Sequence, residues 1–212
     1  MAVRLFVGLG NPGARYAGTR HNAGFWFLER LAGMVGLALR PEPRLGVRLA
    51  QGEIAGEKVW LAAPESWMNE SGRPVRAVLD YFRIPSESLL VAHDELDLPP
   101  GTVRLKRDGG HGGHNGLRDL IAHLGHGRFS RLRIGIGHPG HRDEVTPWVL
   151  SAPSAEDRAR IDQALSRALE VTSELVRGHW AAAQQRLHAP VGERGKERPH
   201  RAAGAAGGSN GA

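Results

Sequence analysis

The residues best suited to chemistry are one histidine, one aspartate and three asparagines, which lie in four short polar or glycine-rich segments. A histidine can act as a general base toward water because its pKa lies close to neutral pH. A carboxylate partner then holds the tautomer of the ring and stabilises the imidazolium. We expect His21 to be this base and Asp94 to be this partner.

The asparagines are Asn11, Asn69 and Asn115. A side-chain amide offers a donor and an acceptor without charge, so it can bind a peptide-like substrate or stabilise a developing oxyanion. Each asparagine could equally cap a helix or a turn, and Asn115 stands just before a predicted helix. It is the set, more than any one residue, that favours acid–base hydrolysis without a metal or a covalent nucleophile.

Two other kinds of site match parts of the same segments. Residues 8–13 spell the dinucleotide-binding pattern G-x-G-x-x-G. That pattern needs a helix that opens at the glycines, whereas Pro12 interrupts the turn and the next helix is predicted to begin near Asn22. Potential metal ligands accompany Asp94, namely His21, His93, His111 and His114. The chain has neither an H-E-x-x-H pattern nor a cysteine, so we expect no metal and no cofactor.

Strand-like and helix-like stretches alternate along the chain, which predicts an α/β fold. The expected strands are residues 3–8, 47–49, 59–62, 89–92, 102–105 and 132–136. The expected helices are residues 22–37, 72–82, 117–124 and 154–180, the last beginning with a capping pair of Ser154 and Asp157. Ligands bind at the carboxyl ends of the strands in an open α/β sheet. We therefore expect the four segments, residues 8–22, 67–72, 93–97 and 109–116, to meet at one edge.

The composition limits the class of protein. A chain of 212 residues suits one globular domain, and the absence of cysteine excludes disulfides, thiolate metal sites and a cysteine nucleophile. No stretch approaches the roughly 20 apolar residues of a membrane span, and no leader pattern precedes the first strand, so we expect a cytoplasmic protein. From residue 190 the sequence lacks apolar periodicity. We expect a catalytic domain over residues 1–189 and a disordered basic Gly/Ala-rich tail over residues 190–212.

Basic residues are concentrated in one part of the chain. From Arg104 to Arg142 there are eight arginines and lysines against two aspartates, so this span carries the whole formal excess of +6. Such a concentration favours a polyanionic partner, with nucleic acid first. A solvated basic surface is the alternative.

As a set, the polar segments closely resemble those of bacterial peptidyl-tRNA hydrolases, in the same order along the chain. The likeness runs from about Val3 to His188. The matching stretches are Gly-Leu-Gly-Asn-Pro-Gly (8–13), Thr-Arg-His-Asn (19–22), Met-Asn-Glu-Ser-Gly (68–72), His-Asp-Glu-Leu-Asp (93–97), Gly-Gly-His-Asn-Gly-Leu (112–117) and Arg-Leu-Arg-Ile-Gly-Ile-Gly (131–137). None is diagnostic alone, but together they are highly specific.

The resemblance implies a monomeric α/β domain with a mixed, mostly parallel central sheet flanked by helices. It also implies a metal-independent esterase that cuts peptidyl-tRNA at the bond between the peptide and the 3′ end of the tRNA. The implied partner is therefore peptidyl-tRNA, with no cofactor and no membrane.

The resemblance further assigns roles to individual residues. His21 matches the catalytic base, Asp94 the acid that holds it, and Asn11 the position that senses whether the amino group is blocked. The matching substrate-binding positions are Tyr16, Trp67, Met68, Asn69 and Asn115. Lys106 and Arg133 match basic residues that hold the tRNA phosphates.

The chain departs from the family pattern in a few places. Ala63 stands where the family usually has a lysine, and Trp67 where it has Phe or Tyr, which keeps an aromatic surface for stacking. Asp108 replaces a usual glycine and adds a negative charge near the expected tRNA path. Two alternatives remain open: a non-catalytic RNA-binding module, and a nucleotide-dependent enzyme that uses the glycine-rich turn.

Overall fold

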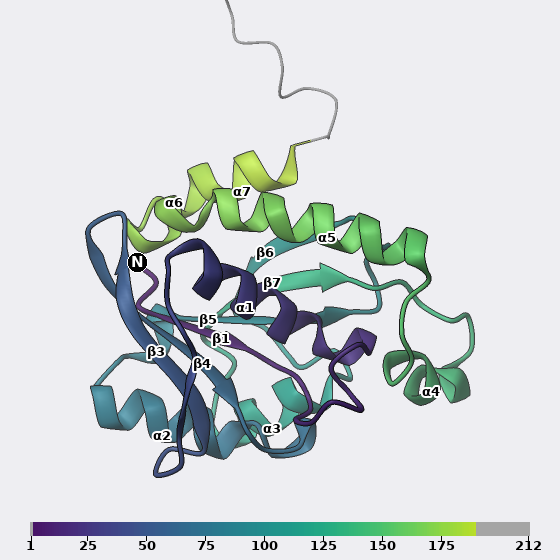
Figure 1. Ribbon diagram of the computed structural model, residues 1–212, viewed down its shortest axis with the longest axis horizontal. Coiled ribbons are helices and arrows are strands. Elements are labelled where there is room, and N and C mark those ends of the chain that lie inside the picture. The colour runs from purple at the N-terminus through teal and green to yellow at the C-terminus, as the bar shows by residue number, and fades with distance from the viewer. Residues whose placement is uncertain (1, 190–212) are drawn as a thin grey trace, which may run out of the picture.

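The computed structural model describes residues 2–189, which form a seven-stranded sheet between two layers of helices (Figure 1). The strand order is β2-β3-β4-β1-β5-β7-β6. The strands are β1 (Leu5–Gly8), β2 (Arg40–Glu42), β3 (Val47–Ile54), β4 (Glu57–Pro64), β5 (Leu89–Glu95), β6 (Val103–Arg107) and β7 (Ser130–Gly135). The central strands β4, β1, β5 and β7 run parallel, whereas β2, β3 and β6 join by antiparallel pairing. The predicted α/β class with a mixed, mostly parallel sheet is therefore confirmed.

The helices divide between the two faces of the sheet. They are α1 (Ala23–Met34), α2 (Gly72–Phe82), α3 (Asn115–Leu124), α4 (Val145–Val149), α5 (Ala155–Glu170), α6 (Thr172–Val176) and α7 (Trp180–His188). In Figure 1, α1, α5, α6 and α7 cover one face, α2 and α3 cover the other, and α4 stands apart at one side. No helix within residues 2–189 has the length and apolar composition that a bilayer span requires.

The central strands are buried on both sides, which explains why they appear in the sequence as continuous apolar runs. In β1, Phe6 points into the core beneath α1 and α5, whereas Leu5 and Val7 point into the core beneath α2 and α3. All four β1 residues are buried. Packing against the two cores fixes the register of the strand, because a shift of one residue would turn each side chain toward the opposite face of the sheet.

The predicted helix over residues 154–180 is wrong in its length, because the chain forms three helices there. Ser154 caps the start as expected, its Oγ accepting the N–H of Asp157 at 3.1 Å. The Thr172 hydroxyl donates to the carbonyl of Leu169 at 2.8 Å, a local bond that competes with helix continuation. Gly178, with φ of 79°, then ends α6. The break lets α7 fold back along the outer strand β6.

The edge of β6 is covered by side chains of α7. Leu105 donates its N–H to Nε2 of His188 at 2.9 Å, and Gln184 donates to the Leu105 carbonyl at 3.4 Å. These bonds satisfy backbone groups that would otherwise be open to another strand. The expected tail, residues 190–212, lies outside the described residues.

One segment reaches the site by a route that the sequence analysis did not anticipate. Because β6 is antiparallel, its last residue, Arg107, lies beside Ser130 at the start of β7, away from the carboxyl ends of the parallel strands. Residues 108–114 then return toward those ends. Buried Arg131 holds this return by donating to the carbonyls of Gly109 and Gly110.

Candidate active site

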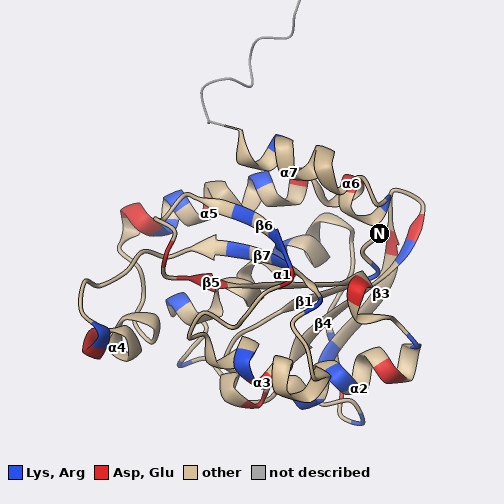
Figure 2. Cartoon of the chain, turned by 180° about the vertical axis from the view of Figure 1, so that it is seen from behind, with Lys and Arg blue, Asp and Glu red and all other residues tan. Residues whose placement is uncertain are grey.

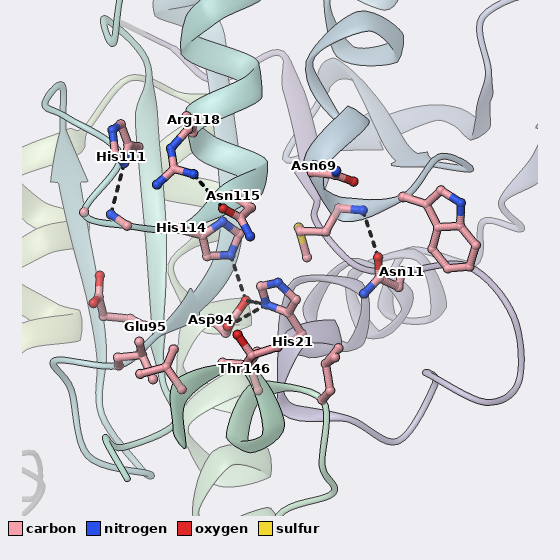
Figure 3. A pocket seen from close by; sticks show the side chains of 18 of the residues that line it. Asn11, His21, Asn69, Asp94, Glu95, His111, His114, Asn115, Arg118 and Thr146 are labelled. Atoms are coloured by element: carbon pink, nitrogen blue, oxygen red, sulfur yellow. Dashed lines mark hydrogen bonds and ion pairs between the residues drawn. The ribbon is translucent and has the colours of Figure 1, made fainter. Parts of the chain in front are cut away.

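A pocket of about 620 Å³ opens at the carboxyl ends of the parallel strands, and most of the expected residues line it (Figure 3). Those that line it are Asn11, His21, Trp67, Met68, Asn69, Asp94 and Asn115. They come from the β1–α1 connection, the 3₁₀ turn Arg20–Asn22, the 3₁₀ turn Met68–Glu70, β5 and the start of α3. The tertiary structure therefore brings together residues that stand up to about a hundred positions apart in the chain.

His21 and Asp94 form a buried pair. Nδ1 of His21 lies 3.0 and 2.9 Å from the two carboxylate oxygens of Asp94. An ionised carboxylate only accepts, so Nδ1 carries the proton and donates it. This tautomer leaves Nε2 of His21 as an unprotonated acceptor, which is the state a general base requires.

The environment controls the charge of both groups. Burial alone lowers the pKa of His21, but the charge of Asp94 and the hydrogen bond to it outweigh burial and raise that pKa above its ordinary value. Burial alone would raise the pKa of Asp94. The neighbouring His21 and His114 outweigh it and hold that pKa well below its usual range, so the carboxylate stays ionised.

The role of His114 was not predicted from the sequence, which pointed to this residue only as a potential metal ligand. It caps α3, its Nδ1 accepting the N–H of Leu117 at 3.3 Å, while its Nε2 lies 2.8 Å from Oδ1 of Asp94. The cap requires Nδ1 without a proton, so the neutral ring donates from Nε2 to the carboxylate. Asp94 thus accepts from two imidazoles. The alternative role of Asn115 as a helix cap is excluded, because Asn115 is the first residue inside α3 and His114 is the cap.

The same three residues are close enough to consider a metal ion. Among residues 2–189, the donor atoms of His21, Asp94 and His114 lie within 4.8 Å of one another. A metal on Nε2 of neutral His114 would require the proton on Nδ1, where it would face the N–H of Leu117. The hydrogen bonds therefore match the His–Asp–His arrangement better than metal ligation.

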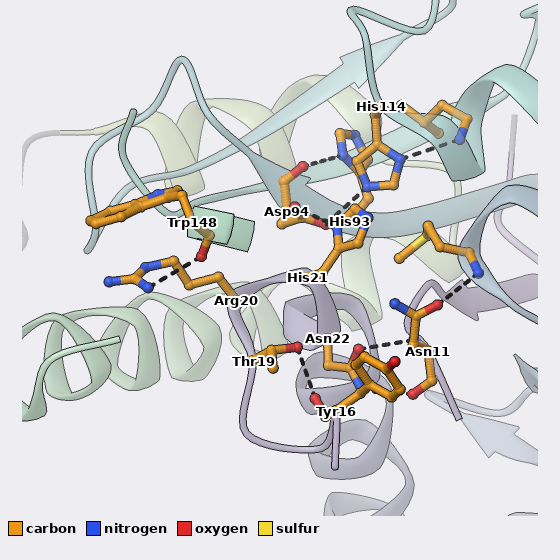
Figure 4. A network of polar contacts seen from close by, with 12 residues as sticks. Asn11, Tyr16, Thr19, Arg20, His21, Asn22, His93, Asp94, His114 and Trp148 are labelled. Atoms are coloured by element: carbon orange, nitrogen blue, oxygen red, sulfur yellow. Dashed lines mark hydrogen bonds and ion pairs between the residues drawn. The ribbon is translucent and has the colours of Figure 1, made fainter. Parts of the chain in front are cut away.

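Two amides are oriented by their own partners. Oδ1 of Asn11 accepts the N–H of Met68 at 2.8 Å, so its NH₂ group is left as a donor (Figure 3). Oδ1 of Asn115 accepts from Arg118 at 2.9 Å, with the same consequence. Asn22, another residue that was not predicted, holds the Asn11 backbone by two bonds of 2.9 Å (Figure 4).

The remaining predicted residues, Tyr16, Lys106 and Arg133, do not line the pocket. The Tyr16 ring meets the Trp67 ring edge to face, with centroids 5.6 Å apart. Lys106 is exposed on β6, and Arg133 on β7 donates to Glu95 at 2.8 Å. Figure 2 shows basic segments on β6, β7 and α3. Glu95, which lines the pocket, and the wall formed by α4 were not anticipated from the sequence.

Comparisons with known proteins agree with this geometry. The family model described as Peptidyl-tRNA hydrolase matches residues 5–197. The chain is 54% identical over 187 residues to a peptidyl-tRNA hydrolase of Xanthomonas oryzae pv. oryzae, covering 88% of this chain and 96% of that protein. It is also 54% identical to one of Acidithiobacillus ferrooxidans, covering 87% of this chain and 97% of that protein.

Solved structures lead to the same result. The crystal structure of peptidyl-tRNA hydrolase from Acinetobacter baumannii superposes with a TM-score of 0.86 at 45% identity, over 88% of this chain and 95% of that one. The likeness therefore extends over most of the chain. The chain belongs to the peptidyl-tRNA hydrolase family and is an enzyme of the hydrolase class.

Proposed function

We propose that this enzyme hydrolyses the ester bond between a peptide, or an N-blocked amino acid, and the 3′ end of its tRNA, and so recycles the tRNA. Family membership supports the substrate class. The observation that carries the chemistry is the His21–Asp94 pair, which faces the pocket and keeps Nε2 of His21 available as a base.

The reaction follows from the protonation states of the pair. Nε2 of His21 removes a proton from a water molecule, and the water oxygen attacks the ester carbonyl. Asp94 stabilises the imidazolium that results. When the tetrahedral intermediate collapses, the carbon–oxygen bond to the ribose breaks. His21 then returns its proton to the ribose oxygen.

The asparagines select and stabilise the substrate. The NH₂ group of Asn11 donates to the carbonyl that blocks the substrate's amino group. A free ammonium group cannot accept such a bond, so the unblocked substrate loses this contact. Asn69 and Asn115 line the pocket, and in this mechanism their NH₂ groups stabilise the oxyanion, since amide donors that face the developing charge contribute most in the transition state.

The tRNA itself is bound at the rim of the pocket. Tyr16 and Trp67 offer an aromatic surface on which a terminal base can stack, and Trp67 is 51% exposed. Lys106 and Arg133 hold phosphates. The Nε–H of Arg133 already donates to Glu95, so Arg133 binds phosphate with its other N–H groups. Lys106 is exposed on β6 and binds phosphate with its ammonium group.

We infer further that the enzyme acts in the cytoplasm as a monomer and that residues 1–189 are its catalytic domain. Every side chain with a role above lies between Asn11 and Arg133, which supports the domain limits. Sedimentation velocity at micromolar concentration would test the monomer.

The first experiment compares an N-blocked aminoacyl-tRNA with the same tRNA carrying a free amino group, with a chelator present. We expect cleavage of the blocked substrate alone. The variant His21→Ala should lose at least about a hundredfold in kcat, the range that general base catalysis contributes. His179→Ala, at an exposed histidine before α7, is the matched control and should keep full activity.

The possible failures differ in meaning. Tight tRNA binding by the wild type without cleavage of either substrate would favour the non-catalytic RNA-binding module. Cleavage by His21→Ala at the wild-type rate would contradict the assigned base. Loss of activity on adding the chelator would show that the His–Asp–His cluster works through a metal ion.

A further inference from the structure

One wall of the pocket is formed by the short helix α4. It lies between β7 and α5 and stands apart from the other helices (Figure 1). It contributes the lining residues Val145, Thr146, Val149 and Leu150. Because His21 lines the same pocket, the distance between α4 and the catalytic turn determines how wide the pocket is.

Arg20 connects the catalytic turn to this wall. Its side chain is buried, its guanidinium lies 3.6 Å from the centre of the Trp148 ring, and its backbone N–H donates to the Ser151 carbonyl at 3.0 Å. Nη1 faces four acceptors at the end of α4, namely the Trp148 carbonyl (3.3 Å), the Ser151 carbonyl (3.3 Å), Ser151 Oγ (2.7 Å) and the Ala152 carbonyl (2.9 Å). The Trp148 carbonyl also accepts from the N–H and the hydroxyl of Ser151, at 3.2 and 2.8 Å. Carbonyls that follow a helix end lack partners within the helix, so Arg20 supplies donors to those of Ser151 and Ala152.

Arg20 and His21 are neighbours in one 3₁₀ turn, and their side chains go to different parts of the molecule (Figure 4). His21 contacts Asp94 on β5, whereas Arg20 contacts the end of α4. Loss of the Arg20 contacts would therefore release the wall, whereas the bonds to Asp94 would still hold His21. Lysine cannot reproduce this anchor, because it lacks the planar group that stacks on an aromatic ring while donating in several directions.

We propose that Arg20 is a positioning residue that fixes the α4 wall against the catalytic turn and thereby determines how tightly the peptide part of the substrate binds. This inference rests on the proposed function. The ester group and the first blocked residue lie at His21 and Asn11, whereas a longer peptide extends along the apolar wall. Arg20 consequently acts on KM for long peptides more than on the chemical step.

The test compares Arg20→Lys with the wild type on two substrates: an N-acetyl-aminoacyl-tRNA and a tRNA that carries an acetylated tetrapeptide of apolar residues. We expect KM for the tetrapeptide substrate to rise about tenfold, the effect of losing roughly one or two hydrogen bonds. KM for the short substrate and kcat for both should change less than about threefold. A purely structural defect would lower activity on both substrates alike.

Arg30→Lys is the matched control. Arg30 joins α1 to α5 through Asp162, with contacts of 3.2 Å to its carbonyl and 2.7 Å to its carboxylate, and it does not line the pocket. This variant also removes a guanidinium that bridges two segments. Its ratio of KM values for the two substrates should equal that of the wild type.

Hydrogen exchange gives a second readout that does not depend on activity. The amides of Leu150 and Ser151 donate to the carbonyls of Thr146 and Trp148. They should exchange faster in Arg20→Lys than in the wild type, and at the wild-type rate in Arg30→Lys. If Arg20→Lys does not fold, Ser151→Ala replaces it, because this variant removes the acceptor with the shortest contact to Arg20. KM for the tetrapeptide substrate should then rise selectively, by less than in Arg20→Lys.

Equal KM changes on both substrates, or unchanged exchange in α4, would overturn the inference. These results are distinct from failure of the proposed function, in which the wild type cleaves neither substrate.

Discussion

At the level of single residues, the site depends on which nitrogen of each imidazole carries the proton. Asp94 takes Nδ1–H of His21 and Nε2–H of His114, and these two bonds set the tautomers of both rings. His93, which directly precedes Asp94 in the chain, does not compete with His21 as a base. Burial, helped by the neighbouring His114, lowers the pKa of His93 to about 3. Among these three histidines, His21 is the one that has both a free acceptor nitrogen and a raised pKa.

The pH profile of kcat/KM should therefore report His21. Only its neutral form can act as a base, so activity should fall as the pH drops through the pKa of His21. The raised pKa of this ring places the midpoint above the ordinary histidine value of about 6.5. Asp94→Asn should move the midpoint to lower pH, because the negative charge that favours the imidazolium is gone. It should also lower the plateau by about a hundredfold or more.

The profile is measured with an N-blocked substrate between pH 5 and 9, with thermal unfolding of both proteins as the control for folding. An unchanged midpoint in Asp94→Asn would mean that the titration belongs to another group.

At the level of elements, the close approach of α1 to the sheet positions His21, the proposed base. His21 stands two residues before Ala23, the first residue of α1, and Gly24 in the first turn lies against β5 and the end of β1. A Cβ at Gly24 would come within 2.3 Å of the Ala92 carbonyl oxygen and 2.5 Å of the Leu9 nitrogen. Only a residue without a side chain allows the helix to lie this close, so glycine here is required by packing and not by a positive φ.

Two alanine substitutions in α1 should consequently have opposite effects on stability. Gly24→Ala should lower the free energy of unfolding by about 3 kcal/mol, because backbone atoms of two strands must move. Gly33→Ala, whose Cβ would meet nothing within 4 Å, should raise it by up to about 1 kcal/mol through helix propensity. Denaturant unfolding of both variants gives the comparison. A small change in the free energy of unfolding of Gly24→Ala would contradict this prediction, because it would show that α1 can shift along the sheet without cost.

At the level of the whole molecule, the formal charge of +6 comes from one span of the chain, and that span folds beside the pocket. Figure 2 shows basic positions on β6, β7 and α3, and β7 pairs with β5, which carries Asp94. Two basic residues of this span, Arg118 and Arg142, line the pocket, which favours the proposed entry of a polyanion there.

Salt should weaken tRNA binding through this span. The affinity should fall steeply with salt concentration, and Lys106→Ala should reduce the logarithmic slope by about 1, as for the loss of one phosphate contact. Lys58→Ala is the control, because Lys58 lies on β4 at the end of the sheet away from the pocket. Filter binding of a deacylated tRNA at several salt concentrations measures both slopes. Equal slopes for Lys106→Ala and the wild type would remove Lys106 from the tRNA path.

Much of the fold could be predicted because the signals are local. Buried strands such as β1 and β5 are continuous apolar runs, and Ser154 caps α5 as its spacing with Asp157 indicates. The break at Thr172 could not be predicted, because the apolar stripe continues through it. The break lets α7 pack along β6, a contact between distant parts of the chain.

The sequence by itself determined the family, the α/β class and the candidate pair of His21 and Asp94, because these depend on residue types in a distinctive order. Only the tertiary structure decided that His114 shares the carboxylate of Asp94 and that Arg20 holds α4. A hydrogen bond depends on distances of about 3 Å between atoms of separate elements. No spacing along one chain contains those distances until the sheet and its helices have packed.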